Sequence, residues 1–249
     1  MDDVHSVLLS VRAEARQLVA PDFVVLDAMI EHTAGSKQEA VRSAAASLGH
    51  LTTDLAALGG VPFTEGAGRR PMTWSAHSSA TREEQYHDQQ TGRVVRSGQV
   101  TATVAVRVTI RDLGMLEAAG EVLAAHPSLN LHAVAWQVDW DNPVWPQVRA
   151  AAIQAAIGKA RDYAAALGAT VERVEHVADA GLLGDEATAY RSSAARALSA
   201  GAEGSLALDP VPQQLIATID ARVRATGMSL TTVQSPPATV RQRDAQRDA

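Results

Sequence analysis

The sequence contains no cysteine, which excludes disulfide bonds, thiolate nucleophiles and cysteine-ligated zinc. It also lacks an excess of basic residues. Lys and Arg number 22 against 28 Asp and Glu, which gives a net charge of −6. A protein that binds nucleic acid usually carries a basic face, so this balance argues against nucleic acid as a partner. It argues equally against adsorption to anionic membranes.

Long hydrophobic runs are absent as well. No stretch approaches the ~20 apolar residues that a helix needs to span a bilayer. The first residues, Met1 to His5, form no basic segment, and the apolar run that follows is broken at Arg12. This pattern differs from that of a signal peptide. On the assumption that Met1 is the natural start, we expect a cytoplasmic protein with no membrane span.

Motifs for catalysis or metal binding are also missing. The eight histidines show neither H-x-x-x-H nor H-E-x-x-H spacing, and no G-x-S-x-G sequence occurs. The glycines before Arg69-Arg70 fit no phosphate-binding pattern, so we interpret residues 61–70 as a surface loop. The sequence therefore predicts no catalytic residue, no metal site and no cofactor. It leaves open whether the chain is an enzyme, and favours a protein that is not an enzyme.

The hydrophobic periodicity that is present predicts several strands. Residues 4–19 and 23–33 alternate around the break at Pro21-Asp22, and we expect these two strands to form an antiparallel pair. Residues 72–90 and 93–111 predict a long hairpin, because the second segment alternates apolar with small or polar residues. Further strands are predicted at 129–140, 171–177 and 213–226.

Helical periodicity appears between these strands. Ser36 is a good N-cap with Glu39 completing a capping box, and a helix over 36–58 ends at Gly59-Gly60. A second helix is predicted from Asp112 to about His126. A third, over 144–167, carries an alanine-rich stripe, which predicts that this helix lies close to a sheet.

The resulting order, β-β-α-β-β-α-β-α-β-β, predicts an α+β fold with mostly antiparallel sheets and helices packed on one face. We expect one domain over residues 1–230. Within it, the Ala/Ser/Gly/Glu-rich segment 180–209 is predicted to be a mobile excursion. The Pro-, Gln- and Arg-rich residues 235–249 are predicted to be a disordered tail.

The most distinctive cluster of side chains lies at the end of the predicted strand 129–140. Tryptophan supplies four of only nine aromatic residues, and three of the four lie here. They can anchor a subunit interface, line a groove or pack in the core. The two aspartates suggest a carboxylate pair beside an aromatic platform, or simply a polar strand end. The candidate residues for ligand binding or an interface are Trp136, Asp139, Trp140, Asp141 and Trp145.

Several features recur in an order that is typical of one family. Pro21-Asp22 precedes a strand, and the helix 36–58 is followed by Gly60-Val61. The helix 144–167 carries paired alanines, Lys159-Ala160-Arg161 and a closing Leu167-Gly168, and Asp209-Pro210-Val211-Pro212 precedes the last strand. Over roughly residues 4–226 the chain resembles the SIMPL-domain family, the YggE-like bacterial proteins.

The resemblance implies an α+β fold and a tendency to form ring-like or larger homo-oligomers. It also implies a role in protein interaction, the cell envelope or stress protection, and it supplies no active-site residues. We therefore predict a non-enzymatic, self-assembling protein that acts through protein–protein surfaces, with other proteins as further partners and a role in stress. The alternative is a small-molecule or metal-binding protein, an enzyme included, that uses the 136–141 strand end.

Overall fold

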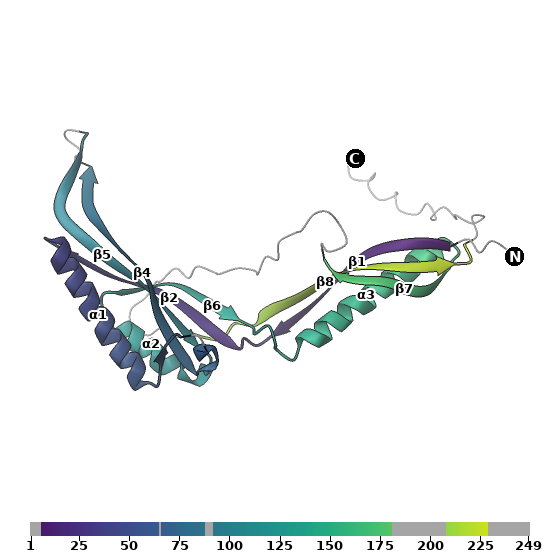
Figure 1. Cartoon of the computed structure of the whole chain (residues 1–249), viewed down its shortest axis with the longest axis horizontal. Coiled ribbons are helices and arrows are strands. Elements are labelled where there is room, and N and C mark those ends of the chain that lie inside the picture. Colours follow the sequence, from purple (N-terminus) through teal and green to yellow (C-terminus); the bar gives the residue numbers. More distant parts are fainter. Residues whose placement is uncertain (1–5, 65, 88–91, 181–207, 229–249) are drawn as a thin grey trace, which may run out of the picture. The chain divides into compact units, whose positions relative to one another are not determined.

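The computed structural model describes residues 6–64, 66–87, 92–180 and 208–228. These residues form an α+β fold, as predicted, whose element order differs from the expected one by a two-residue strand and two short 3₁₀ helices, Ala67–Arg69 and Leu113–Met115 (Figure 1). The elements are β1 (Ser6–Val19), β2 (Phe23–Ala34), α1 (Lys37–Ala57), β3 (Val61–Pro62), β4 (Met72–His87), β5 (Val94–Ile110), α2 (Leu116–Ala125), β6 (Leu129–Gln137), α3 (Trp145–Ala166), β7 (Thr170–Asp179) and β8 (Gln213–Thr226).

The chain divides into two compact units. The first combines the described parts of Met1–Gln17, Pro146–Ala189 and Ile216–Ala249, and the second combines those of Leu18–Trp145 and Tyr190–Leu215. The prediction of one domain over 1–230 stays a prediction. The predicted tail, and all of the predicted excursion except its ends, lie outside the described residues.

The second unit is a five-stranded sheet in the order β3-β4-β5-β2-β6, with α1 and α2 on one face (Figure 1). The pairs β4–β5, β5–β2 and β2–β6 are antiparallel, which confirms the predicted hairpin, and the short β3 pairs parallel to β4. The core lies between sheet and helices, because alternate residues of β2 and β5 meet the apolar side of α1. Its fully buried large side chains are Val24, Leu26, Ile30, Leu51, Leu55, Met72, Val106, Val108, Ile110 and Leu123.

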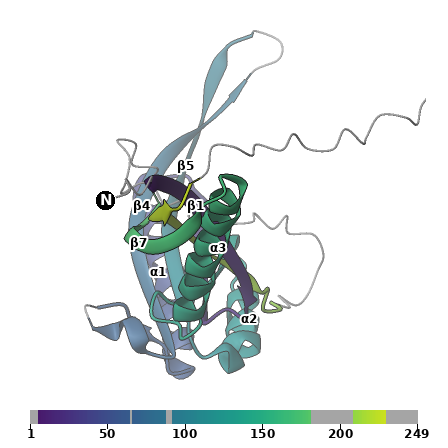
Figure 2. The ribbon, with the colours of Figure 1, turned by 90° about the vertical axis from the view of Figure 1, so that its right-hand side faces the viewer.

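The first unit is a three-stranded sheet in the order β1-β8-β7 with α3 along it (Figure 2). The buried side of α3 consists almost wholly of alanines, and alternate residues of β8 are buried beneath it. Small side chains let the helix approach the strands closely, as the sequence predicted. On the other face of the sheet, Arg12 of β1 binds both carboxylate oxygens of Asp220 of β8, at 2.7 and 3.0 Å.

The prediction that the first two strands pair with each other is wrong. β1 lies in the three-stranded sheet and β2 in the five-stranded one. A tight hairpin needs residues with positive φ, and the positive-φ glycines of the described chain all lie elsewhere. Asp22 instead starts the pairing of β2 with β6, because its N–H donates to the carbonyl oxygen of Gln137 at 2.8 Å.

Three strands at or near the borders of the sheets carry bulges. In β4, β6 and β7 the pairing register skips one or two residues of that strand, and every skipped residue is polar. Bulges and polar side chains on a border strand disfavour pairing with a strand of another molecule. The skipped residues are His77, Glu84, His132, Glu172 and Glu175.

One of these residues is expected to make the stability of the first unit depend on pH in the acid range. Glu175 accepts a hydrogen bond from Arg224 on β8, which lowers the pKa of Glu175 below its ordinary value of about 4.3. A lowered folded-state pKa gives stability that is present above about pH 4.3 and is lost as the pH falls through the folded-state value. We expect Glu175→Gln to lower the urea midpoint at pH 7, and the difference from wild type to shrink as the pH falls below about 4.3. Glu172→Gln is the matched control, since Glu172 accepts a hydrogen bond from Arg173 of its own strand and influences Arg224 by its charge rather than by a hydrogen bond. An equal effect there would contradict the assignment to the cross-strand hydrogen bond.

Candidate functional site

Three of the five predicted site residues lie on a turn that follows β6. The strand ends at Gln137, and the N–H of Asn142 donates to the carbonyl oxygen of Asp139 at 3.2 Å. We call residues Asp139–Asn142 the Trp140 turn. The prediction that the strand continues to Trp140 is therefore wrong, and Trp136 and Trp140 do not share a strand face. Pro143, which has no N–H, follows the turn and cannot prolong a strand ladder.

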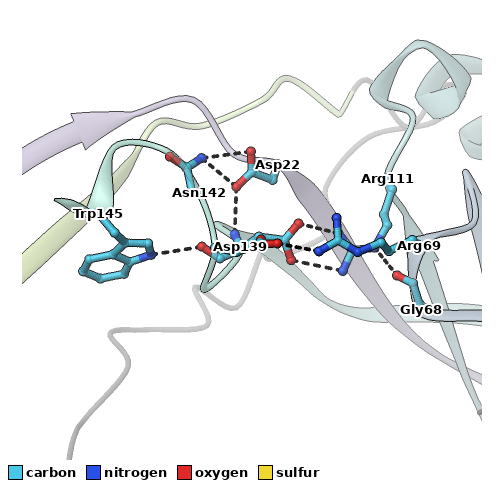
Figure 3. A network of polar contacts seen from close by, with 8 residues as sticks. Asp22, Gly68, Arg69, Arg111, Asp139, Asn142 and Trp145 are labelled. Atoms are coloured by element: carbon cyan, nitrogen blue, oxygen red, sulfur yellow. Dashed lines mark hydrogen bonds and ion pairs between the residues drawn. The ribbon is translucent and has the colours of Figure 1, made fainter. Parts of the chain in front are cut away.

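Arg111 holds the turn from the end of β5. Its two terminal nitrogens donate to the two carboxylate oxygens of Asp139, at 2.6 and 3.2 Å (Figure 3). Its Nε donates to the carbonyl oxygen of Gly68, and the guanidinium lies 4.3 Å from the centre of the Phe23 ring. Both charged side chains are only about a quarter exposed, at 24% and 25%. A bidentate, charge-assisted pair in such surroundings fixes both partners.

Asp22 holds the same turn from the start of β2. One of its carboxylate oxygens accepts the backbone N–H of Asp139 at 2.7 Å (Figure 3). Both oxygens accept the side-chain amide of Asn142, at 3.0 and 2.8 Å. The amide oxygen of Asn142 in turn accepts the N–H of Val144 at 2.9 Å, just before α3 begins. The turn is thereby tied to the sheet through three carboxylate contacts.

The remaining candidates have different roles. Trp145 donates from its indole nitrogen to the carbonyl oxygen of Asp139 at 3.0 Å, and Trp136 packs against the hydrophobic core. Asp141 binds Arg69, and this hydrogen bond raises the pKa of Arg69 above its ordinary value. Trp140 is 81% exposed. The structure thus places three of the five candidates on the turn, a fourth, Trp145, in contact with the turn from the start of α3, and the fifth, Trp136, against the core.

The geometry does not favour acid–base catalysis at this turn. Each of the two aspartates of the predicted carboxylate pair has an arginine partner, Arg111 for Asp139 and Arg69 for Asp141. Paired with fixed cations, these carboxylates hold the turn and the neighbouring loop in place. Among the described residues, no group of three or more His, Asp or Glu side chains is placed to hold a metal ion.

Sequence reasoning missed the residues that hold the turn. They come from the start of β2, the end of β5 and the loop before β4, which the sequence predicted only as a surface loop. The register pairs Val24 with Ile110 and Phe23 with Gln137, so these strand ends meet at one end of the sheet. The only local signals were the turn-forming pairs Pro21-Asp22 and Asn142-Pro143.

Fold and site together describe a mostly antiparallel α+β protein whose paired charges support an exposed aromatic turn. The profile of the SIMPL family, described as a protein of unknown function (DUF541), matches residues 9–226. The chain belongs to the SIMPL family, which confirms the resemblance seen in the sequence. No curated protein matches the chain significantly. Within the part of the chain that the structure describes, no helix is long and apolar enough to cross a membrane.

Proposed function

We propose that this protein is a non-enzymatic, self-assembling SIMPL protein that acts through protein–protein surfaces. The observation that supports it is Trp140, which is 81% exposed on a turn fixed by Asp22, Arg111 and Trp145. Tryptophan is among the residues that most often dominate binding energy at interfaces. A role in stress and a cytoplasmic location stay predictions from the sequence.

The energetics favour Trp140 as an anchor over other exposed apolar residues. Burying about 150 Å² of an aromatic side chain gains ~4 kcal/mol at ~25 cal/mol per Å², before the costs of association. A side chain on a mobile loop would lose part of this gain through ordering, whereas the Trp140 turn is already held by hydrogen bonds. The anchor is therefore preorganised.

The alternative function, a small-molecule or metal site at 136–141, has less support. It needs carboxylates that are free to bind a ligand or to transfer a proton. The carboxylates of Asp139 and Asp141 are each engaged by an arginine, and Trp136 packs against the core. Association through Trp140 needs none of these groups to be free.

Light scattering on a size-exclusion column tests the proposal directly. We expect the full chain and a version ending after Thr226 both to elute, over a range of concentrations, as a discrete species with a multiple of the 26.2 kDa chain mass. Assembly by both versions would assign it to the folded part of the chain. A mass of one chain at every concentration in both versions would overturn the proposal.

A matched pair of variants tests whether Trp140 is the anchor. We expect Trp140→Ala to weaken association by ~30-fold or more, because a hot-spot residue contributes at least ~2 kcal/mol. Tyr163→Ala is the control, since Tyr163 is another exposed aromatic residue, on α3. Sedimentation equilibrium measures both dissociation constants. Equal values for the two variants would contradict the role given to Trp140.

A further inference from the structure

We infer that the outer part of the β4–β5 hairpin is an arm that turns about a hinge, and that the Glu84 side chain is the latch that holds the arm at one angle. The arm comprises residues 85–87 and 94–96 of the described chain, and the hinge comprises Glu84 and Ser97–Gln99. The inference goes beyond the proposed self-assembly, because it concerns a movement within one chain. The latch sets how strongly a binding partner must favour another angle before the arm moves.

The arm extends beyond the part of the sheet that has a third strand. The pairing of β2 with β5 ends where Ala34 meets Val100. β4 and β5 continue to pair as far as His87 and Val94, so the arm is a ribbon of two strands (Figure 1). An isolated two-stranded hairpin is at best marginally stable in water. The position of the arm therefore depends on the contacts at its base.

The strand pairing is interrupted at this base. Three residues of β5, Ser97–Gln99, lie opposite the single residue Glu84 of β4. Gly98, in the middle of the three, has a φ of +76°, a conformation that other residues adopt only at a cost. A bulge bends the strand that carries it and increases its local twist. The hairpin thus has a defined point about which the arm can turn.

Side-chain hydrogen bonds connect the two sides of the hinge. The hydroxyl of Ser97 donates to the carbonyl oxygen of Glu84 at 2.9 Å and accepts the N–H of Gln99 at 3.1 Å. From the supported part of β5, the hydroxyl of Thr101 donates to Oε1 of Glu84 at 2.7 Å. The same oxygen accepts Nη2 of Arg82 at 3.1 Å. Glu84 is thus bound to the bulge through its backbone and to the sheet through its side chain.

The latch continues into β2 through hydroxyl groups. The Oγ1 atoms of Thr33 and Thr101 lie 2.6 Å apart, and Thr101 is only 7% exposed. The hydrogen bonds from Thr101 and Arg82 lower the pKa of Glu84, so its carboxylate is ionised at neutral pH and can only accept. The single proton of the Thr101 hydroxyl is therefore used on Glu84, and Thr33 has to donate to Thr101. This chain joins the hinge to a strand with which the arm does not pair.

Distances between spin labels test the hinge. Because the chain has no cysteine, Gln38→Cys on α1 and Val94→Cys on the arm introduce the only labelling sites. Pulsed electron resonance measures the distance, with labelled protein diluted into unlabelled protein so that only pairs within one chain contribute. We expect one distance without further changes. In Thr101→Val we expect a second distance and an at least ~10-fold higher ratio of displaced to latched arm, because a hydrogen bond to a charged group is lost.

Matched variants on the same strands are the controls. Thr103→Val makes the same change further along β5, where the hydroxyl has no hydrogen-bond partner among the described residues. Glu83→Ala removes a neighbouring carboxylate that forms an exposed ion pair with Arg96 across the hinge, and such pairs contribute little. Both are expected to keep the original distance. Glu84→Ala is expected to act like Thr101→Val, and the double variant to add little, because both changes break the same hydrogen bond.

The experiment separates a failure of the hinge from other failures. A second label pair, at Gln38 and Glu121 on the two helices, is expected to keep its distance in every variant, which shows that the unit stays folded. Unchanged arm distances in Thr101→Val and Glu84→Ala, or an equal change in Thr103→Val, would overturn the inference. Loss of hydrogen-exchange protection along the arm without a second distance would also overturn it, because the arm would then unpair instead of turning. A monomeric protein would overturn the proposed function and not the hinge.

Discussion

Replacing Asp139 with alanine is expected to lower the free energy of unfolding of the second unit by about 2–4 kcal/mol. The change leaves Arg111 about one quarter exposed and without its bidentate partner, so a charge is left poorly solvated and poorly paired. The contacts that Asp139 makes through its backbone, to Asp22 and Trp145, are not removed by the substitution. Urea denaturation followed by circular dichroism and tryptophan fluorescence measures the loss.

Asp141→Ala is the matched control on the same turn. Its partner Arg69 is 80% exposed, and exposed ion pairs contribute about 0–1 kcal/mol. We therefore expect a change of less than about 1 kcal/mol. If the two aspartates prove equally important for stability, the assignment of Asp139 and Arg111 as the support of the turn is wrong.

Ala156→Leu is expected to destabilise the first unit by about 3 kcal/mol. Ala156 has no exposed surface, and it lies in the middle of the stripe that α3 packs against its sheet. A leucine adds three carbon atoms where no space exists, so the helix has to move away from the strands or the side chain has to adopt a strained rotamer. Thermal or urea unfolding followed by circular dichroism measures the effect.

Ala155→Leu makes the same chemical change one position away, on the exposed side of α3. We expect it to alter stability by no more than about 0.5 kcal/mol, as exposed substitutions usually do. Similar losses from the two variants would show that α3 does not pack through its alanine stripe.

Local sequence signals predicted most of the elements but not their partners. Ser36 caps α1 by accepting the N–H of Glu39, and α3 ends just before Gly168, whose φ is +66°. Such caps and periodicities depend on neighbouring residues, so a sequence displays them directly. The separation of β1 and β2 into two sheets depends on β8 and β5, which lie far along the chain, and no local signal reports it.

The candidate site likewise contains residues that the local sequence revealed and residues that only the fold reveals. Asp139, Trp140, Asp141 and Trp145 were found because they are close in sequence. Their partners Asp22, Arg69 and Arg111 were not, because the register of β2 with β5 and β6 brings them to the turn. Knowing the arginines changes the interpretation of the aspartates, which act as structural anchors that leave Trp140 as the exposed group.

Photo-crosslinking from position 140 tests most directly whether the chain assembles through the Trp140 turn. A benzophenone amino acid replaces Trp140 in one preparation and Tyr163 in a second, and each is irradiated at a concentration where the wild type is assembled. We predict a covalent dimer from position 140 and little dimer from position 163. The absence of a covalent dimer from position 140, or an equal yield from position 163, would contradict this account.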